Sequence, residues 1–224
     1  MVKQLVAVVV FGLVIAFNLA DAQKSNKVKE KAKKVLDQVS DNYQAYNAIK
    51  ADFKLTLENR QSDFEEVQKG TIYLKNQKFR VSLGDHIIIC DGDNIWTYLK
   101  EVKEVQINNY KPEEMDINPT EMFTIYKKDF RYGYKGNKEK NGQTYDIVEL
   151  TPENKEKSYF KVRLLINQTS HDVRQTKIFE KDGTIFTYQI KDFEPNPSIE
   201  KGTFSFQKND YPNVETIDLR KKDN

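Results

Sequence analysis

The stretch Asp91–Asn108, DGDNIWTYLKEVKEVQIN, contains two short strand patterns, each preceded by residues typical of turns. It follows HIIIC at residues 86–90, which is apolar at nearly every position. A sheet with one solvated face alternates apolar and polar residues, because successive side chains point to opposite faces. Both stretches break this alternation. They therefore predict a sheet that is covered on both faces here.

Similar strand patterns fill most of the chain on either side of this stretch. In ADFKLTLEN at residues 51–59, Phe53, Leu55 and Leu57 share one face. About eleven such strands follow one another as far as TIFTYQIKDFEPN at residues 184–196. Links such as ENKEK at residues 153–157 and KDG at residues 181–183 are typical of hairpin connections. The rhythm predicts an antiparallel meander, barrel or sandwich.

Two segments have helical patterns instead. Residues 24–49 carry one apolar stripe at steps of three and four, formed by Val28, Ala32, Val35, Leu36, Val39, Tyr43 and Tyr46. The second segment, NPTEMFTIY at residues 118–126, begins with Asn118 as an expected N-cap and Pro119 near the helix start. Its apolar side comprises Met122, Phe123, Ile125 and Tyr126. We expect this short helix to pack over the open mouth of the sheet.

The first 22 residues are typical of a secretory signal peptide. Lys3 precedes an apolar run from Leu5 to Phe17, and ADA at residues 20–22 fits a cleavage site. The run is shorter than the roughly 20 residues that span a bilayer, although an uncleaved anchor is the alternative. We expect cleavage after Ala22 and one domain over residues 23–224. Gln23 would then be the N-terminal residue, so no N-terminal cysteine marks the chain for lipid attachment.

Composition argues against several classes of function. Lys and Arg number 36 and Asp and Glu 34, which gives a net charge of +2 and disfavours nucleic acid as the main partner. Cys90 is the single cysteine, so no disulfide framework is possible. The two histidines, His86 and His171, have no metal-ligand spacing, and DGDNIW departs from a calcium loop at its fifth and sixth positions. Without a recognisable nucleophile and base, we predict neither an enzyme nor a cofactor.

The apolar residues on the second face have two interpretations. Helices or loops can cover that face, as in an ordinary two-layer domain. Alternatively, the sheet forms a deep trough whose concave face holds a hydrophobic ligand beneath the helices. Buried strands look the same in both cases, so the pattern alone leaves both open.

In their order, these features resemble the LolA-type outer-membrane lipoprotein carrier family. The matching pieces include GTIYLKNQKFRV at residues 70–81, CDGDNIWTYLKEVKEVQI at residues 90–107 and NPTEMF at residues 118–123. Near the end of the chain, KGTFSFQKND at residues 201–210 precedes YPNVETIDL at residues 211–219. The Asp-Gly-x-x-Ile-Trp-x-Tyr segment is the most specific of these. Together the pieces cover nearly all of the exported chain.

The resemblance implies a mainly β fold, an open (incomplete) antiparallel β-barrel of about eleven strands with helices forming a lid over a hydrophobic cavity. It implies a periplasmic chaperone that binds lipoprotein acyl chains there and carries them from the inner to the outer membrane. The expected cavity residues are Leu36, Val39, Phe53, Leu55, Leu57, Ile72, Phe79, Val81, Ile88, Trp96 and Tyr98, and the expected lid residues are Met122, Phe123, Ile125 and Tyr126.

The implied partners are lipoproteins, an inner-membrane ABC-type lipoprotein-releasing complex and an outer-membrane receptor, with the carrier itself a monomer. A lipid-sensing regulatory or lipid-binding module on the same fold is the alternative. One departure concerns the lid: the family often has an Arg-Pro pair before the KFRV segment, and here those positions are Asn76 and Gln77. The neighbouring Arg80 is not an automatic substitute.

Overall fold

The computed structural model describes residues 23, 25–59, 61–115, 118–121, 126 and 130–220. Within these residues the protein is one large open sheet of twelve strands with a single long helix at residues 25–44. The expected signal peptide and the lid residues Met122, Phe123 and Ile125 lie outside the described residues. Among the described residues, no helix combines the length and apolar character needed to cross a membrane.

The first half of the sheet is a meander of β1 (Ile49–Asn59), β2 (Phe64–Lys75), β3 (Lys78–Leu83), β4 (His86–Cys90), β5 (Asn94–Leu99) and β6 (Glu104–Asn109). The second half comprises β7 (Phe130–Lys140), β8 (Gln143–Pro152), β9 (Tyr159–Asn167), β10 (Val173–Glu180) and β11 (Thr184–Pro195). A last short strand, β12 (Glu215–Asp218), and the 3-10 turns η1 (Pro112–Glu114) and η3 (Lys208–Asp210) complete the elements.

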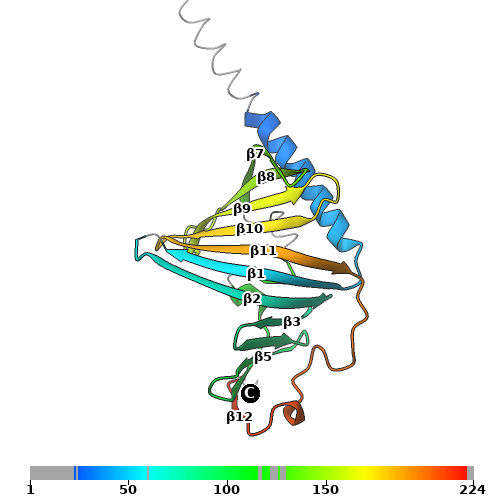
Figure 1. Cartoon of the computed structure of the whole chain (residues 1–224), viewed down its shortest axis with the longest axis vertical. Coiled ribbons are helices and arrows are strands. Elements are labelled where there is room, and N and C mark those ends of the chain that lie inside the picture. The colour runs from blue at the N-terminus through cyan, green and yellow to red at the C-terminus, as the bar shows by residue number, and fades with distance from the viewer. Residues whose placement is uncertain are drawn as a thin grey trace, which may run out of the picture.

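The two halves join through β1 and β11, so that the strand order is β12-β6-β5-β4-β3-β2-β1-β11-β10-β9-β8-β7. Neighbouring strands are antiparallel, except that β12 runs parallel to β6. Strands β7 and β12 form the two ends of the sheet and do not pair with each other (Figure 1). The expected incomplete barrel is therefore an open, twisted sheet.

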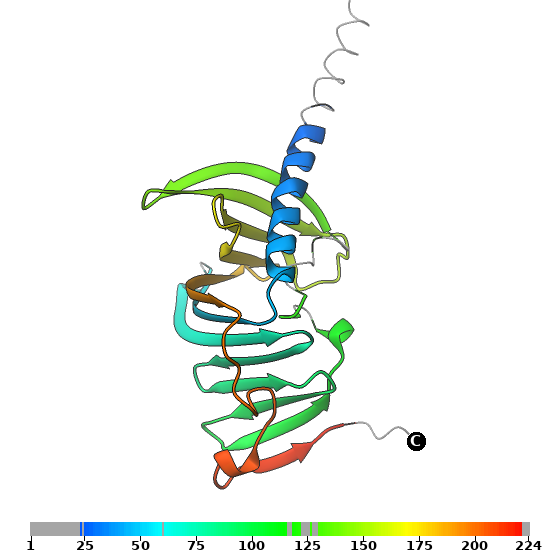
Figure 2. The same ribbon diagram turned by 90° about the vertical axis from the view of Figure 1, so that its right-hand side faces the viewer.

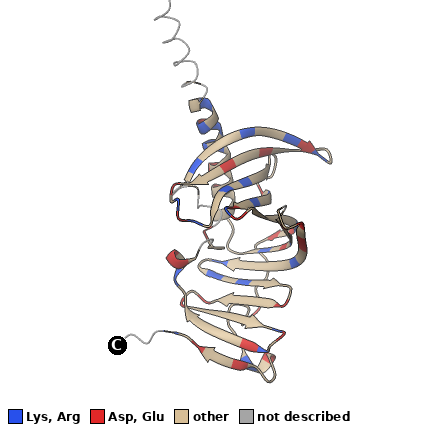
Figure 3. Ribbon diagram, turned by 90° about the vertical axis from the view of Figure 1, so that its left-hand side faces the viewer, with Lys and Arg blue, Asp and Glu red and all other residues tan. Residues whose placement is uncertain are grey.

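The helix lies across the β7–β11 half, and the C-terminal segment runs back along the β1–β6 half (Figures 1 and 2). The helix packs on the sheet through its apolar stripe of Ala32, Val35, Leu36, Val39 and Tyr43. This stripe forms one cluster with apolar residues of β8, β9 and β10, which we call the main cluster. We call the sheet face toward the helix the inner face and the opposite one the outer face. Basic and acidic residues are spread over the strands rather than collected by sign (Figure 3).

Several predicted boundaries were wrong. The helix ends at residue 44, so Tyr46 lies beyond it and packs beside the cluster from the loop. Strand β2 begins at Phe64 and therefore contains Glu65 and Glu66. Strand β12 was not predicted, because four residues with polar neighbours give little periodic signal. The eleven predicted strands otherwise correspond to β1–β11.

Candidate functional site

The inner face carries a band of apolar side chains that continues beyond the helix. In the register, Val81 of β3 lies between Ile72 of β2 and Ile88 of β4. All three are half-buried and pack against the main cluster, as do Ile95, Leu164, Phe186 and Tyr188. These side chains are neither sealed within the core nor replaced by polar residues. This half-buried apolar band is the feature best suited to hold a hydrophobic ligand.

Phe53 of β1 is buried beside the band, at a position where β2 has a glycine opposite it. The pair Phe53–Gly70 is in register, and a methyl group on Gly70 would lie 2.5 Å from Cζ of Phe53. The same methyl group would lie 2.8 Å from the carbonyl oxygen of Ser82. The phenyl ring therefore lies over the β2 backbone, 6.0 Å from the ring of Tyr188 on the other side. Gly70 gives the inner face room that no other residue would leave.

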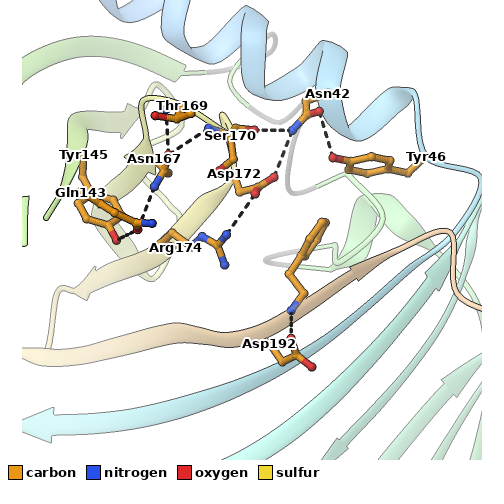
Figure 4. Close-up of polar contacts among 11 residues, drawn as sticks. Asn42, Tyr46, Gln143, Tyr145, Asn167, Thr169, Ser170, Asp172, Arg174 and Asp192 are labelled. Carbon is orange, nitrogen blue, oxygen red and sulfur yellow. Dashed lines mark hydrogen bonds and ion pairs between the residues drawn. The ribbon is translucent and has the colours of Figure 1, made fainter. Parts of the chain in front are cut away.

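A polar network anchors the C-terminal end of the helix to the turn between β9 and β10 (Figure 4). The amide Nδ2 of Asn42 donates to the carbonyl oxygen of Ser170 at 3.0 Å and to Oδ1 of Asp172 at 3.1 Å. Asp172 is buried, and Arg174 lies 3.3 Å from its other oxygen. The hydroxyl of Tyr46 donates to Oδ1 of Asn42 at 3.0 Å. This network fixes one end of the helix against the sheet.

Tyr126 is the one expected lid residue within the described part of the chain. It is buried in the main cluster, and its hydroxyl donates to Oδ1 of Asp37 on the helix at 3.1 Å. Burial is the main cause that raises the pKa of this hydroxyl above its usual value. Its ring lies edge-on to Tyr132, 6.2 Å between centroids. Upstream, Oδ1 of Asn118 accepts from the backbone N–H of Thr120 at 3.1 Å, but residues 119–121 form a turn rather than the expected start of a helix.

The second face of the β3–β6 region is covered by the C-terminal segment. Ile87 and Ile89 of β4, Tyr98 of β5 and Val105 of β6 form a separate cluster with Val214. Trp96, Phe206 and Tyr211 pack against this cluster. The ring of Tyr211 stacks on Phe206 and lies 4.6 Å from Tyr98. Residues 203–214, which we call the strap, therefore lie on the outer face. Their cover explains why β4 and β5 carry apolar residues on both faces.

Two predicted cavity residues are therefore on the wrong face. Trp96 and Tyr98 were expected to share a face with Ile88, but strand alternation directs them to the outer face beneath the strap. Arg80 also points outward: it donates to the carbonyl oxygen of Thr203 at 3.3 Å and to the hydroxyl of Tyr211 at 3.0 Å. Arg80 thus holds the strap, while Asn76 occupies the β2–β3 turn with a positive φ of 54°.

The remaining predicted cavity residues lie on the inner face. Leu36, Val39 and Phe79 are fully buried in the main cluster, Ile72, Val81 and Ile88 are half-buried beside it, and Phe53, Leu55 and Leu57 follow on β1. Leu164, Phe186 and Tyr188 also pack against the main cluster and were not predicted from the sequence. The alternation in TIFTYQI at residues 184–190 was the signal that could have assigned Phe186 and Tyr188 to one face.

The polar residues near Cys90 maintain the hairpin between β4 and β5. Oδ1 of Asp91 accepts from the backbone N–H groups of Asp93 at 2.9 Å and Asn94 at 2.8 Å, and Gly92 has a φ of 101°. This carboxylate is used as a turn acceptor. Burial raises the pKa of the Cys90 thiol to about 11. Within the described residues, no group of three or more His, Cys, Asp or Glu is placed to hold a metal ion.

Comparison with known proteins gives one family. The family model described as "Outer membrane lipoprotein carrier protein LolA" matches residues 44–207. No curated protein matches the sequence.

Solved structures resemble the chain at low sequence identity. An uncharacterized conserved protein from Thermus thermophilus is 12% identical, with a TM-score of 0.55 over 85% of this chain and 99% of that one. A LolA superfamily protein from Nitrosomonas europaea is 12% identical, with a TM-score of 0.43 over 78% of this chain and 97% of that one. The Mycobacterium tuberculosis lipoprotein LppX is 10% identical, with a TM-score of 0.47 over 76% and 99%. At 12% identity, the likeness to the Thermus thermophilus protein shows the fold alone. The other two likenesses, with TM-scores under 0.5, carry no argument.

Proposed function

Because the chain belongs to the LolA family of outer membrane lipoprotein carriers, we propose that it binds lipoprotein acyl chains on its inner face. The observation that carries the proposal is the half-buried apolar band that includes Ile72, Val81 and Ile88. A packed two-layer domain would bury such side chains fully. Here they are continuous with the core and remain partly accessible, which suits a ligand that arrives and leaves.

The energetics of acyl chains fit such a band. Each buried methylene contributes roughly 0.8 kcal/mol, so one sheltered long chain gains on the order of 10 kcal/mol. A carrier must release its cargo, so part of this gain has to be offset by movement of a cover or by incomplete burial. The helix, anchored by Asn42, and the segment containing Tyr126, bonded to Asp37, are the elements that we assign to this cover.

The full proposal is a periplasmic chaperone, exported by cleavage after Ala22, that moves lipoproteins from the inner to the outer membrane. An inner-membrane ABC-type releasing complex would load it, and an outer-membrane receptor would accept the cargo. Since Arg80 holds the strap on the outer face, it does not hold the cover closed. Closure then depends on the helix anchor and on the contact between Tyr126 and Asp37 rather than on an arginine near position 76.

A pair of adjacent half-buried residues tests which face binds the acyl chain. Val81 points to the inner face and Ser82 to the outer face, because their partners on β4 are Ile88 and Ile87. Val81→Cys and Ser82→Cys can each be labelled with a benzophenone maleimide, since the native Cys90 is fully buried. Labelled proteins would be irradiated with a fluorescent fatty acid and with a purified triacylated lipoprotein, and unlabelled wild type would serve as the background.

We expect crosslinks from position 81 and only background from position 82. Equal crosslinking from both positions, or none from either with binding intact, would contradict the assignment to the inner face. Crosslinking of the fatty acid but not of the lipoprotein would favour the lipid-binding or lipid-sensing module over the lipoprotein carrier.

A further inference from the structure

The outer face of β7–β10 carries a group of cations around one carboxylate. Arg163 of β9 lies 2.6 Å from an oxygen of Glu149 on β8, and Lys135 of β7 lies 3.5 Å from the other oxygen. Burial acts to raise the pKa of Glu149, but Arg163, Lys161 and Lys135 together lower it. Three positive charges therefore surround one negative charge, and the group keeps an excess of positive charge.

Two phenylalanines lie among these cations. Phe160 is exposed, and its ring centroid is 6.3 Å from that of Phe179. Nζ of Lys161 lies 4.1 Å from the Phe179 centroid, and the guanidinium carbon of Arg163 lies 5.6 Å from it. A register shift between β9 and β10 at this point turns Phe160 and Lys161 outward together. We call Lys135, Phe160, Lys161, Arg163 and Phe179 the basic–aromatic patch.

We propose that the basic–aromatic patch docks the protein on the surface of an anionic lipid bilayer. Exposed cations attract acidic headgroups within a Debye length, and aromatic rings bury their apolar bodies at the headgroup level. The patch faces away from the helix and the inner face, so docking leaves the cargo band free. This inference goes beyond cargo binding and stands on different residues. It would bring a carrier to the membrane without insertion of a helix.

The test is sedimentation of the whole protein with vesicles, comparing mixed phosphatidylglycerol–phosphatidylcholine vesicles with pure phosphatidylcholine. The patch variant is Lys135→Gln/Lys161→Gln, which keeps the Arg163–Glu149 pair. The matched control is Lys75→Gln/Lys78→Gln, which removes the same charge as the patch variant. These two exposed lysines face each other across the β2–β3 turn. We expect the patch variant to lose about 30-fold in affinity for the anionic vesicles.

The control should bind nearly as well as wild type, and pure phosphatidylcholine should bind weakly in every case. Added salt should weaken the binding, whereas Phe160→Ser should weaken it at all salt concentrations. Equal losses in the patch and control variants would overturn the proposal, because they would reflect net charge alone. Unchanged vesicle binding by the patch variant would also overturn it, and an acidic protein would then be the better partner for this surface.

A further variant separates docking from capture of lipid by the inner face. Val81→Glu should reduce binding of a fluorescent fatty acid but leave vesicle sedimentation unchanged. Lys135→Gln/Lys161→Gln should reduce vesicle sedimentation but leave binding of the fatty acid unchanged. If Val81→Glu abolishes sedimentation while circular dichroism shows the fold intact, the vesicles were bound through the inner face and the docking proposal fails.

Discussion

The strap gives the most quantitative prediction. Tyr211 makes three contacts there. Its ring centroid lies 4.6 Å from that of Phe206, on which it stacks, and 4.6 Å from that of Tyr98. Its hydroxyl accepts a hydrogen bond from the Arg80 guanidinium at 3.0 Å. Aromatic pairs contribute about 0.5–1.5 kcal/mol each, and such a hydrogen bond about 1 kcal/mol. We therefore expect Tyr211→Ala to lower the free energy of unfolding by about 3 kcal/mol. Tyr211→Phe, which loses only the hydroxyl, should lower it by about 1 kcal/mol.

Urea unfolding provides the assay, because the single tryptophan, Trp96, packs against this same cluster. With an m-value of about 2 kcal/mol/M, Tyr211→Ala should move the midpoint of the Trp96 fluorescence transition by on the order of 1.5 M. Tyr211→Phe is the matched control, since it keeps both ring contacts. Equal midpoints for the two variants would refute the reasoning, because the aromatic cover would then contribute nothing to stability.

Three further predictions concern the interior and the β4–β5 turn. Gly70→Ala should cost about 2 kcal/mol in urea unfolding because its methyl group would clash with Phe53, and adding Phe53→Leu should restore part of the loss. Cys90, with a pKa of about 11, should resist thiol reagents at neutral pH until the protein unfolds; rapid labelling of the native protein would contradict its burial. Burial acts to raise the pKa of Asp91, but backbone hydrogen bonds from Asn94 and Asp93 lower it overall, so its stabilisation should be present above the unfolded pKa of about 3.9 and be lost as pH falls through the folded value. Asp91→Asn should therefore flatten the acid limb of the stability–pH curve, and an unchanged limb would show that this carboxylate contributes nothing.

Most of the sheet could be predicted because strands such as β1 alternate clearly, β4 is a short apolar run, and turn residues separate the strands. The turn residues expected before the strand at Ile95 form the β4–β5 hairpin turn, in which Gly92 has a positive φ. Alternation within one strand gives relative faces but not which face is inner. That limit explains why Ile88 and Trp96, which were expected to share a face, lie on opposite faces of the sheet.

The strap could not be predicted from local pattern. Phe206 and Tyr211 lie in a largely polar segment, where isolated aromatic residues give no period. Their partners Tyr98 and Arg80 are more than a hundred residues earlier in the chain, so only the folded sheet brings them together. The basic–aromatic patch was missed for a related reason: its cations come from β7 and β9, and their common face depends on register.

Native mass spectrometry of the protein recovered from its own cell envelope, followed by lipid extraction, tests the central claim most directly. We predict a co-purifying triacylated lipoprotein that is absent from a Val81→Glu variant with an intact fold. Repeated recovery of an empty chain that also fails to bind an added fluorescent fatty acid would contradict the account.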